Sequence, residues 1–272
     1  MSPVFSQNDS AAPALERGLE ILLLLADHPQ GLAAHELAVL DLPRASLFRL
    51  LRVLRESGFV EQSERDARYR LGLKALTLGA AALRGLEVVR EAKTHLQQVV
   101  EATRERAELA LMDYPHLVIG DVMDIRLLPG LNAQRGTRVH NLHGMAHGKA
   151  LLAWQPEIAA RYIQEGHLHR LTEKTITDPD ALRAELARIR ERGYATDWGE
   201  HRLNVARVSA PVRGARGRVV AALGVAGPLF RIAPEKEAWL GALVRGAADD
   251  LSRHLGADRV SGTSPDKTSG RE

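Results

Sequence analysis

Between Arg44 and Gly58, apolar and basic residues alternate with the period of an α-helix. The leucines recur at spacings of three and four residues, as on the buried stripe of a helix, at Leu47, Leu50, Leu51 and Leu54. The arginines fall on the opposite side, at Arg44, Arg49, Arg52 and Arg55. The spacing predicts a helix that docks against a core through its leucines and presents its arginines outward.

The flanking segments turn this helix into a helix-turn-helix with a wing. Before it, residues 33–40 are predicted to form a short apolar helix, and Asp41-Leu42-Pro43 supplies the turn. After it, two β-like runs at 59–62 and 68–71 are joined by a polar turn. A helix over 15–27 completes a three-helix core. This order is typical of a winged helix-turn-helix, which binds DNA.

Helical and β-like runs are interleaved in the rest of the chain, which predicts a mixed α/β domain. An Ala/Leu-rich helix over 73–86 and a second helix from about 88 to 106 are predicted to connect the two parts. Further helices are predicted at 145–154, 156–164, 179–192 and 234–255. Strands are predicted at 109–112, 117–122, 205–212 and 218–226. We therefore divide the chain into a disordered tail (1–12), a winged helix-turn-helix domain (13–72), a linker helix (73–90), an effector-binding domain (91–256) and a disordered tail (257–272).

The formal net charge of +3 conceals an uneven distribution. Residues 1–43 hold one basic residue against six acidic ones, whereas residues 44–74 hold eight basic residues against four acidic ones. Because phosphate contacts supply most non-specific affinity for DNA, this segregation favours a DNA-binding surface around the predicted helix. The chain has no cysteine, its start lacks the blocks of a signal peptide, and its longest apolar run is too short to span a bilayer. We expect a cytoplasmic protein without a membrane partner.

Short motifs spread over residues 15–255 carry a family resemblance. They are Leu-Glu-Arg-Gly-Leu-Glu-Ile-Leu (15–22), Leu-Pro-Arg-Ala-Ser-Leu-Phe-Arg-Leu-Leu (42–51), Gly-Phe-Val-Glu (58–61), Tyr-Arg-Leu-Gly (69–72), His-Gly-Met-Ala-His-Gly-Lys-Ala-Leu-Leu-Ala (143–153), Gly-Tyr-Ala-Thr-Asp (193–197), Val-Ser-Ala-Pro-Val-Arg (208–213) and Gly-Arg-Val-Val-Ala-Ala-Leu-Gly-Val-Ala-Gly-Pro (217–228). The chain resembles the IclR family of bacterial transcription regulators. The resemblance implies an α/β (α+β) chain in which a winged helix-turn-helix is joined by a linker helix to a GAF-like effector-binding domain. It also implies homodimers or dimers of dimers that bind operator DNA and a small organic effector.

The candidate DNA-binding residues lie on the recognition helix and the wing, at Arg44, Ala45, Ser46, Phe48, Arg49, Arg52, Arg65, Arg68 and Arg70. Phe48 is expected either to contact a thymine methyl group or to join the core. Ala45 and Phe48 stand where the family more often has Ser and His or Tyr, so the operator sequence does not follow from the resemblance. We expect a dimer to place two recognition helices in successive major grooves of a near-palindrome.

The resemblance places the effector-binding residues at Gly144, Met145, Ala146, Asp197, Arg207, Gly224 and Ala226. The family often has a small residue at the position of Arg207 and serines at those of Gly224 and Ala226. Losing two hydroxyls opens volume, whereas a guanidinium supplies a partner for a carboxylate. We predict an effector that is an organic carboxylate, with aromatic acids among the candidates. The alternative is that Arg207 pairs with Asp197 or Glu200 and has a structural role only.

Two other classes of function remain open. His140, His143 and His147 are spaced three and four apart, which suits a metal-responsive regulator or a metal-dependent enzyme. No acidic residue completes a His-Glu-x-x-His motif, and Gly144 weakens a helix through His143. An architectural DNA protein would leave more than half of the chain without a purpose, and its DNA affinity would be indifferent to metabolites. No nucleophile elbow or phosphate loop occurs, so we expect no enzyme, no resident metal and no cofactor.

Overall fold

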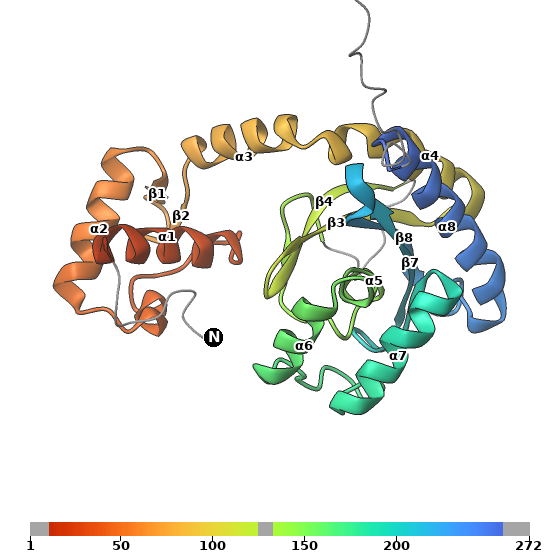
Figure 1. Cartoon of the computed structure of the whole chain (residues 1–272). Helices are drawn as coiled ribbons and strands as arrows, with labels where there is room; N and C mark the ends of the chain where they lie inside the picture. Colours follow the sequence, from red (N-terminus) through yellow and green to blue (C-terminus); the bar gives the residue numbers. More distant parts are fainter. Residues whose placement is uncertain (1–10, 125–132, 258–272) are drawn as a thin grey trace, which may run out of the picture. The chain divides into compact units, whose positions relative to one another are not determined.

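The computed structural model describes residues 11–124 and 133–257 of the chain (Figure 1). The tails predicted at 1–12 and 257–272 therefore lie outside the described residues, apart from positions 11, 12 and 257. The chain divides into two units, one ending at Gly85 and one beginning at Leu86. None of the described helices is both long enough and apolar enough to cross a bilayer.

The first unit has the predicted winged helix-turn-helix order. Its elements are α1 (Pro13–Ala26), the 3-10 turn η1 (Glu36–Leu40), α2 (Arg44–Glu56), β1 (Val60–Gln62), β2 (Tyr69–Leu71) and α3 (Leu73–Gly85). Strands β1 and β2 pair antiparallel as the wing, and Leu32 bridges to Tyr69 beside them. The core gathers residues from every element before α3, among them Ile21, Leu37, Leu51 and Tyr69. Helix α3 buries none of its residues within the described chain.

The apolar helix predicted over 33–40 is wrong in type and length. Only Glu36–Leu40 is helical, and it forms a 3-10 turn. The backbone N–H of Ala33 donates to the Glu36 carboxylate at 2.8 Å, which holds the preceding residues in a turn. Asp41 then takes a left-handed conformation (φ 51°) that ends the element.

The second unit is a six-stranded antiparallel sheet in the order β5-β4-β3-β8-β7-β6. Its strands are β3 (Arg106–Asp113), β4 (His116–Met123), β5 (Arg138–Val139), β6 (Ala195–Trp198), β7 (Val205–Arg213) and β8 (Val219–Pro228). Its helices are α4 (Glu87–Thr103), α5 (Ala146–Ala153), α6 (Pro156–Gln164), α7 (Pro179–Arg192) and α8 (Glu237–His254), with 3-10 turns η2 (Ala215–Gly217) and η3 (Pro234–Lys236). Figure 1 shows α4 and α8 on one side of the curled sheet and α5, α6 and α7 on the other.

The predicted mixed fold is confirmed, although several element boundaries differ from the prediction. The helix predicted to run to residue 106 ends at Thr103, because Arg104 adopts a left-handed conformation (φ 59°) and β3 begins at Arg106. Every residue of α5 is buried, and this helix packs against β7 and β8. The face of the sheet that meets α5 is therefore buried inside the unit, and it carries several charged residues.

Candidate DNA-binding surface and effector cavity

Helix α2 separates its apolar and basic residues as predicted. Leu47 and Leu51 are buried in the core, and Leu50 and Leu54 are half-buried against it. The arginines on the other side are exposed, namely Arg44, Arg49, Arg52 and Arg55. The helix therefore presents a row of cations on a scaffold fixed by its leucines, as a recognition helix requires.

The first turn of α2 leaves backbone donors available to an anion. Pro43 caps the helix, and the first N–H to bond within it is that of Leu47, which donates to the Pro43 carbonyl at 3.0 Å. The N–H groups of Arg44, Ala45 and Ser46 precede this bond and lie at the positive end of the helix dipole. Phe48 is 39% exposed and lies beneath the Arg44 guanidinium, 5.7 Å from ring centre to carbon, so it belongs to the surface and not to the core.

The wing arginines differ in how they are held. Arg68 donates to the Gly31 carbonyl at 2.7 Å and to Glu36 at 2.9 Å, so it ties β2 to the turn before α2. Arg70 donates to Asp66 at 2.7 Å, and this bond lowers the pKa of Asp66 well below its usual value. Arg65 is exposed between β1 and β2, and none of the ion pairs among the described residues involves it.

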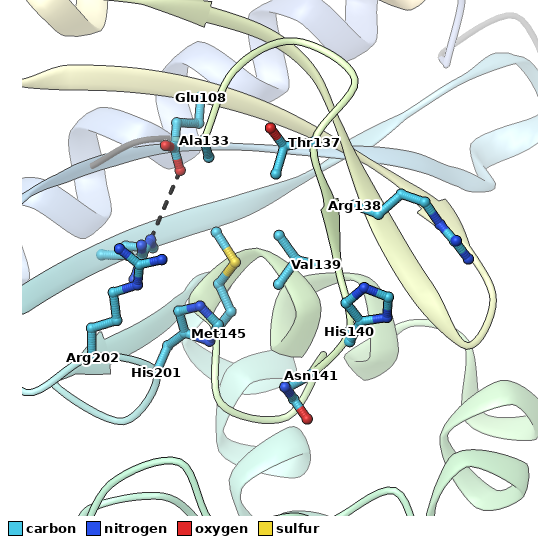
Figure 2. Close-up of a pocket in the computed structure, with 11 residues that line it drawn as sticks. Glu108, Ala133, Thr137, Arg138, Val139, His140, Asn141, Met145, His201 and Arg202 are labelled. Carbon is cyan, nitrogen blue, oxygen red and sulfur yellow. Dashed lines mark ion pairs between the residues drawn. The ribbon is translucent and has the colours of Figure 1, made fainter. Parts of the chain in front are cut away.

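A cavity of about 310 Å³ opens on the α5 side of the sheet (Figure 2). Residues 137–141 and Met145 line it together with the charged side chains of Glu108, Arg202 and Arg207. In Figure 2, Glu108 stands at one end and Asn141 at the other, with Val139 and Met145 between them. The lining combines apolar surface with a few charged groups, which is typical of a site for a small organic molecule.

Strand register brings opposite charges together beside this cavity. Arg106 and Arg207 both lie opposite Ala226 of β8, and Arg207 also lies opposite Asp197 of β6. Glu108 of β3 lies opposite Gly224. Since cross-strand partners project to the same face of a sheet, the two arginines and two carboxylates share the interior face.

These groups form one buried ion-pair network. Arg207 donates to Asp197 at 2.9 Å, and its Nε lies 3.8 Å from Oε2 of Glu108. Arg106 donates to Glu108 at 2.7 Å and to Asp124 at 2.9 Å. Burial by itself would raise the pKa of Glu108, but neighbouring Arg207, His147 and Arg106 outweigh it and hold that pKa below its usual value. Glu108 is therefore ionised at neutral pH.

The predicted effector-binding residues take different places around the cavity. Met145 and Arg207 line it, and Asp197 accepts a hydrogen bond from Nη1 of Arg207. A Cβ at Gly144 would lie 2.9 Å from a terminal methyl carbon of Leu171, so a side chain there would require the Leu171 side chain to shift. Ala146 is buried in the main core of the unit.

The two small residues of β8 do not simply enlarge the cavity. A Cβ at Gly224 would lie 2.5 Å from the Val208 carbonyl and 2.8 Å from the Ser209 side chain, so that space is already filled. Ala226 is fully buried beside Val205. The suggestion that losing two serines opens volume therefore does not hold at Gly224, where Ser209 of the neighbouring strand takes the room.

The sequence-based reasoning missed Glu108, Arg106, His201 and Arg202. A signal for the first two was present, because alternation within β3 places Arg106 and Glu108 on the same face of a strand that is otherwise apolar. Glu200, which was one predicted partner of Arg207, instead accepts two hydrogen bonds from buried Lys149, at 2.6 and 2.7 Å.

The three histidines of the metal hypothesis have different surroundings and do not form one ligand set. His143 lies before α5 and not on it, and its ring nitrogens bond the Tyr162 hydroxyl and the His169 carbonyl, both at 2.9 Å. His147 is fully buried, and burial lowers its pKa to about 4. His140 packs against the His116 ring. In ranges 11–124 and 133–257, no three His, Asp or Glu side chains are grouped to hold a metal ion.

An arginine-bearing winged helix-turn-helix followed by an α/β unit with an internal charged cavity defines a DNA-binding regulator with a ligand-binding domain. Residues 14–64 match the IclR helix-turn-helix domain, and residues 80–253 match the bacterial transcriptional regulator IclR C-terminal domain. The chain belongs to the IclR family of transcriptional regulators, whose members are not enzymes.

Curated relatives and solved structures match this chain over 90% of its length. The HTH-type transcriptional repressor AllR of Escherichia coli (strain K12) is 30% identical over 248 residues, which cover 90% of this chain and 91% of AllR. The glycerol operon regulatory protein of Streptomyces griseus is 34% identical over 253 residues, which cover 90% of this chain and 97% of that protein. The structure of an IclR homolog complexed with 4-hydroxybenzoate, from Microbacterium hydrocarbonoxydans, matches with a TM-score of 0.72 at 26% identity, with 90% and 99% covered. The Thermotoga maritima IclR structure matches with a TM-score of 0.68 at 28% identity, with the same shares covered.

Proposed function

We propose that the protein is a cytoplasmic regulator that binds a near-palindromic operator as a dimer and responds to an organic carboxylate in the cavity beside Arg207. The main support is that one chain combines a row of exposed arginines on α2 with a cavity lined by Arg202 and Arg207. The first suits phosphates and base edges, and the second suits a small anion.

The recognition helix supplies the specific DNA contacts in this proposal. Arg44, Arg49 and Arg52 are exposed on the solvent side of α2, where they can reach the major groove and its phosphates. The free N–H groups of the first turn, around Ser46, suit a phosphate. Arg65 extends from the wing toward flanking backbone.

The substitution Arg49→Ala tests this interface. Arg49 is exposed and lies mid-helix, so its loss should leave the melting temperature unchanged while weakening operator binding by about 1 to 3 kcal/mol. Fluorescence anisotropy on DNA selected by the wild-type protein from a random pool measures the affinity. Arg216→Ala, an exposed arginine of the second unit, is the matched control. Equal affinity of the Arg49→Ala variant and the wild type would exclude α2 as the reading element.

Support for a carboxylate effector comes from Arg207. Its Nη1 donates to Asp197, whereas its buried Nε forms no hydrogen bond with any described residue, and the side chain lines the cavity. Asp197 therefore fixes the guanidinium in place without using all of its donors. The related structure from Microbacterium hydrocarbonoxydans was obtained with 4-hydroxybenzoate, an aromatic carboxylate, which is consistent with an acid as the ligand.

A thermal-shift comparison of carboxylic acids with their methyl esters tests the effector class. Ligands that bind only the native state raise the melting temperature, so acids should stabilise the protein and esters should not. Arg207→Lys retains the charge but loses the fixed Nε donor, and it should reduce the shift. Arg231→Lys is the matched control, because Arg231 also pairs with a carboxylate, that of Glu105, but does not line the cavity. Shifts produced equally by esters would rule out a carboxylate-specific site and leave Arg207 a structural residue.

A further inference from the structure

Two buried atoms of the ion-pair network, on side chains that line the cavity, have no hydrogen-bond partner among the described residues. They are Oε2 of Glu108 and Nε of Arg207, which lie 3.8 Å apart. The side chains are only 1% and 5% exposed, and both line the cavity. A carboxylate oxygen accepts hydrogen bonds and a guanidinium N–H donates one, so the cavity offers an acceptor and a donor side by side.

The other atoms of the two side chains are already held. Oε1 of Glu108 accepts from Arg106 at 2.7 Å, and Nη1 of Arg207 donates to Asp197 at 2.9 Å. Glu108 and Arg207 therefore cannot turn fully toward each other without losing these bonds. Because a buried charged atom without a hydrogen bond is costly, a bound molecule that hydrogen-bonds to both atoms gains affinity from each.

The positions of β8 that lie between Glu108 and Arg207 are small, and Ser209 of β7 fills the space directly above Gly224. Glu108 lies opposite Gly224, and Arg207 lies opposite Ala226, so no side chain larger than a methyl group stands between the pair on this face of β8. Val139 and Met145 form the apolar part of the lining. The recognised head group must therefore be small and bifunctional, and an apolar remainder can lie against Val139 and Met145.

We propose that Glu108 and Arg207 together select carboxylates that carry a hydrogen-bond donor on the neighbouring carbon, such as 2-hydroxy acids. A carboxylate oxygen accepts from Nε of Arg207, and the hydroxyl donates to Oε2 of Glu108. A bare carboxylate satisfies Arg207 but brings its negative charge against an ionised Glu108 without a bridging proton. This inference rests on the proposed carboxylate effector and adds the second half of the recognised group.

Two matched series test the selection in the full-length protein. Mandelate is compared with phenylacetate, and lactate with propanoate, by isothermal titration, alongside the methyl ester of each acid. Hydrogen bonds to charged groups contribute about 1.5 to 3 kcal/mol, so the better-fitting hydroxy acid should bind at least about tenfold more tightly than its deoxy partner. The ester pairs should show the same hydroxyl preference at lower affinity.

The outcomes separate this inference from the proposed effector class. If acids bind better than esters but the hydroxyl makes no difference, the carboxylate site stands and the role given to Glu108 is wrong. If the hydroxyl matters but esters bind as well as acids, the carboxylate class is wrong and the donor selection by Glu108 stands. If the deoxy acids bind and the hydroxy acids do not, this inference alone is wrong, and if none of the four acids binds, neither proposal is supported.

Glu108→Gln adds a test on the protein side. Arg106 needs an acceptor, so the new amide should turn its oxygen toward Arg106 and its NH₂ toward the cavity. The hydroxyl preference should then fall below about threefold, and phenylacetate should bind more tightly because a negative charge is gone. A variant that merely loosened the fold would weaken every ligand alike. Glu105→Gln, which changes a carboxylate bonded to Arg231 outside the lining, should keep the full preference. The wild-type comparison decides the question even if Glu108→Gln does not fold.

Discussion

The three arginines of the wing carry the same charge but differ in their contacts within the protein. Arg68 and Arg70 were predicted as DNA contacts together with Arg65, yet Arg68 binds the Gly31 carbonyl and Glu36, and Arg70 binds Asp66. A guanidinium held by a carboxylate has less to offer a phosphate, because the DNA must compete with the internal partner. The exposed Arg65 is thus the strongest candidate among the wing arginines for a DNA contact.

Substituting each of two wing arginines should separate stability from binding. Arg68→Ala should lower the free energy of unfolding by about 1 kcal/mol, because a carbonyl and a half-buried carboxylate lose their donor. Arg65→Ala should leave stability unchanged and lower DNA affinity, with the slope of log affinity against log salt reduced by about one. Urea titration and anisotropy at several salt concentrations measure the two effects. If Arg68→Ala instead lowered DNA affinity without lowering stability, Arg68 would contact DNA directly.

His147 gives the second unit a calculable sensitivity to acid. Burial lowers its pKa to about 4, below the ordinary value of 6.5, so the unfolded chain binds the proton more tightly than the folded protein does. Stability should therefore be fully present above pH 6.5 and fall as the pH drops toward 4, by about 3 kcal/mol from this residue alone. His147→Leu should remove that part of the slope, as followed by urea unfolding between pH 7 and 4. A variant with the wild-type slope would contradict the assignment.

At the scale of elements, helix α3 stands out because it buries nothing within the described chain. Leu73 and Leu76 are 79% and 69% exposed, and together with Ala80 and Leu83 they follow the three-and-four spacing of a two-helix seam. Leu78, which is 60% exposed, lies on the opposite side of the helix. A seam of this kind matches the proposed dimer, since exposed apolar stripes of this length usually meet a partner.

Charged substitutions on the two faces of α3 should behave differently. Leu76→Lys places a charge in the proposed seam and should shift the protein from dimer to monomer at micromolar concentration, as measured by analytical ultracentrifugation. Leu78→Lys introduces the same charge on the other face and should leave the dimer intact. Dissociation by both variants, or by neither, would place the dimer interface elsewhere.

Elements with a strong period were predictable, and elements fixed by tertiary contacts were not. The helix over 156–164 and the helix over 179–192 match α6 and α7 to the residue, since each begins with a proline and keeps its helical pattern. Strand β5 has only two residues, too few for a pattern. The charged start of β3 was read as the end of a helix, because polar Arg106 and Glu108 contradict the apolar pattern of a buried strand.

The same limit applies to the cavity. Met145 and Arg207 were predicted from family motifs, and both line it. The role of Glu108 depends on the register of β3 against β8 and of β8 against β7, which brings residues about 100 positions apart to one face. Periodicity within a segment carries no information about such a pairing, so only the three-dimensional arrangement reveals the second charge at the site.

At the scale of the whole molecule, the proposed regulation links two units that are continuous through the chain from α3 to α4. An effector can change DNA affinity only if it binds the DNA-competent and DNA-incompetent states with different affinity. Thermodynamic linkage then requires that DNA change effector affinity by the same factor. If DNA lowers effector affinity, the effector releases the protein from DNA. If DNA raises effector affinity, the effector strengthens DNA binding.

This reciprocity is measurable once a hydroxy acid or another carboxylate is shown to bind. Effector affinity is determined by isothermal titration with and without saturating operator DNA, and operator affinity is determined with and without saturating effector. The two ratios should agree, within a typical coupling of about 5-fold to 150-fold. Arg49→Ala, at DNA concentrations too low for this variant to bind, should show the DNA-free effector affinity in both conditions. An effector whose affinity ignores operator DNA would be a ligand of the second unit without a regulatory role, and the cavity would then serve a purpose other than control of DNA binding.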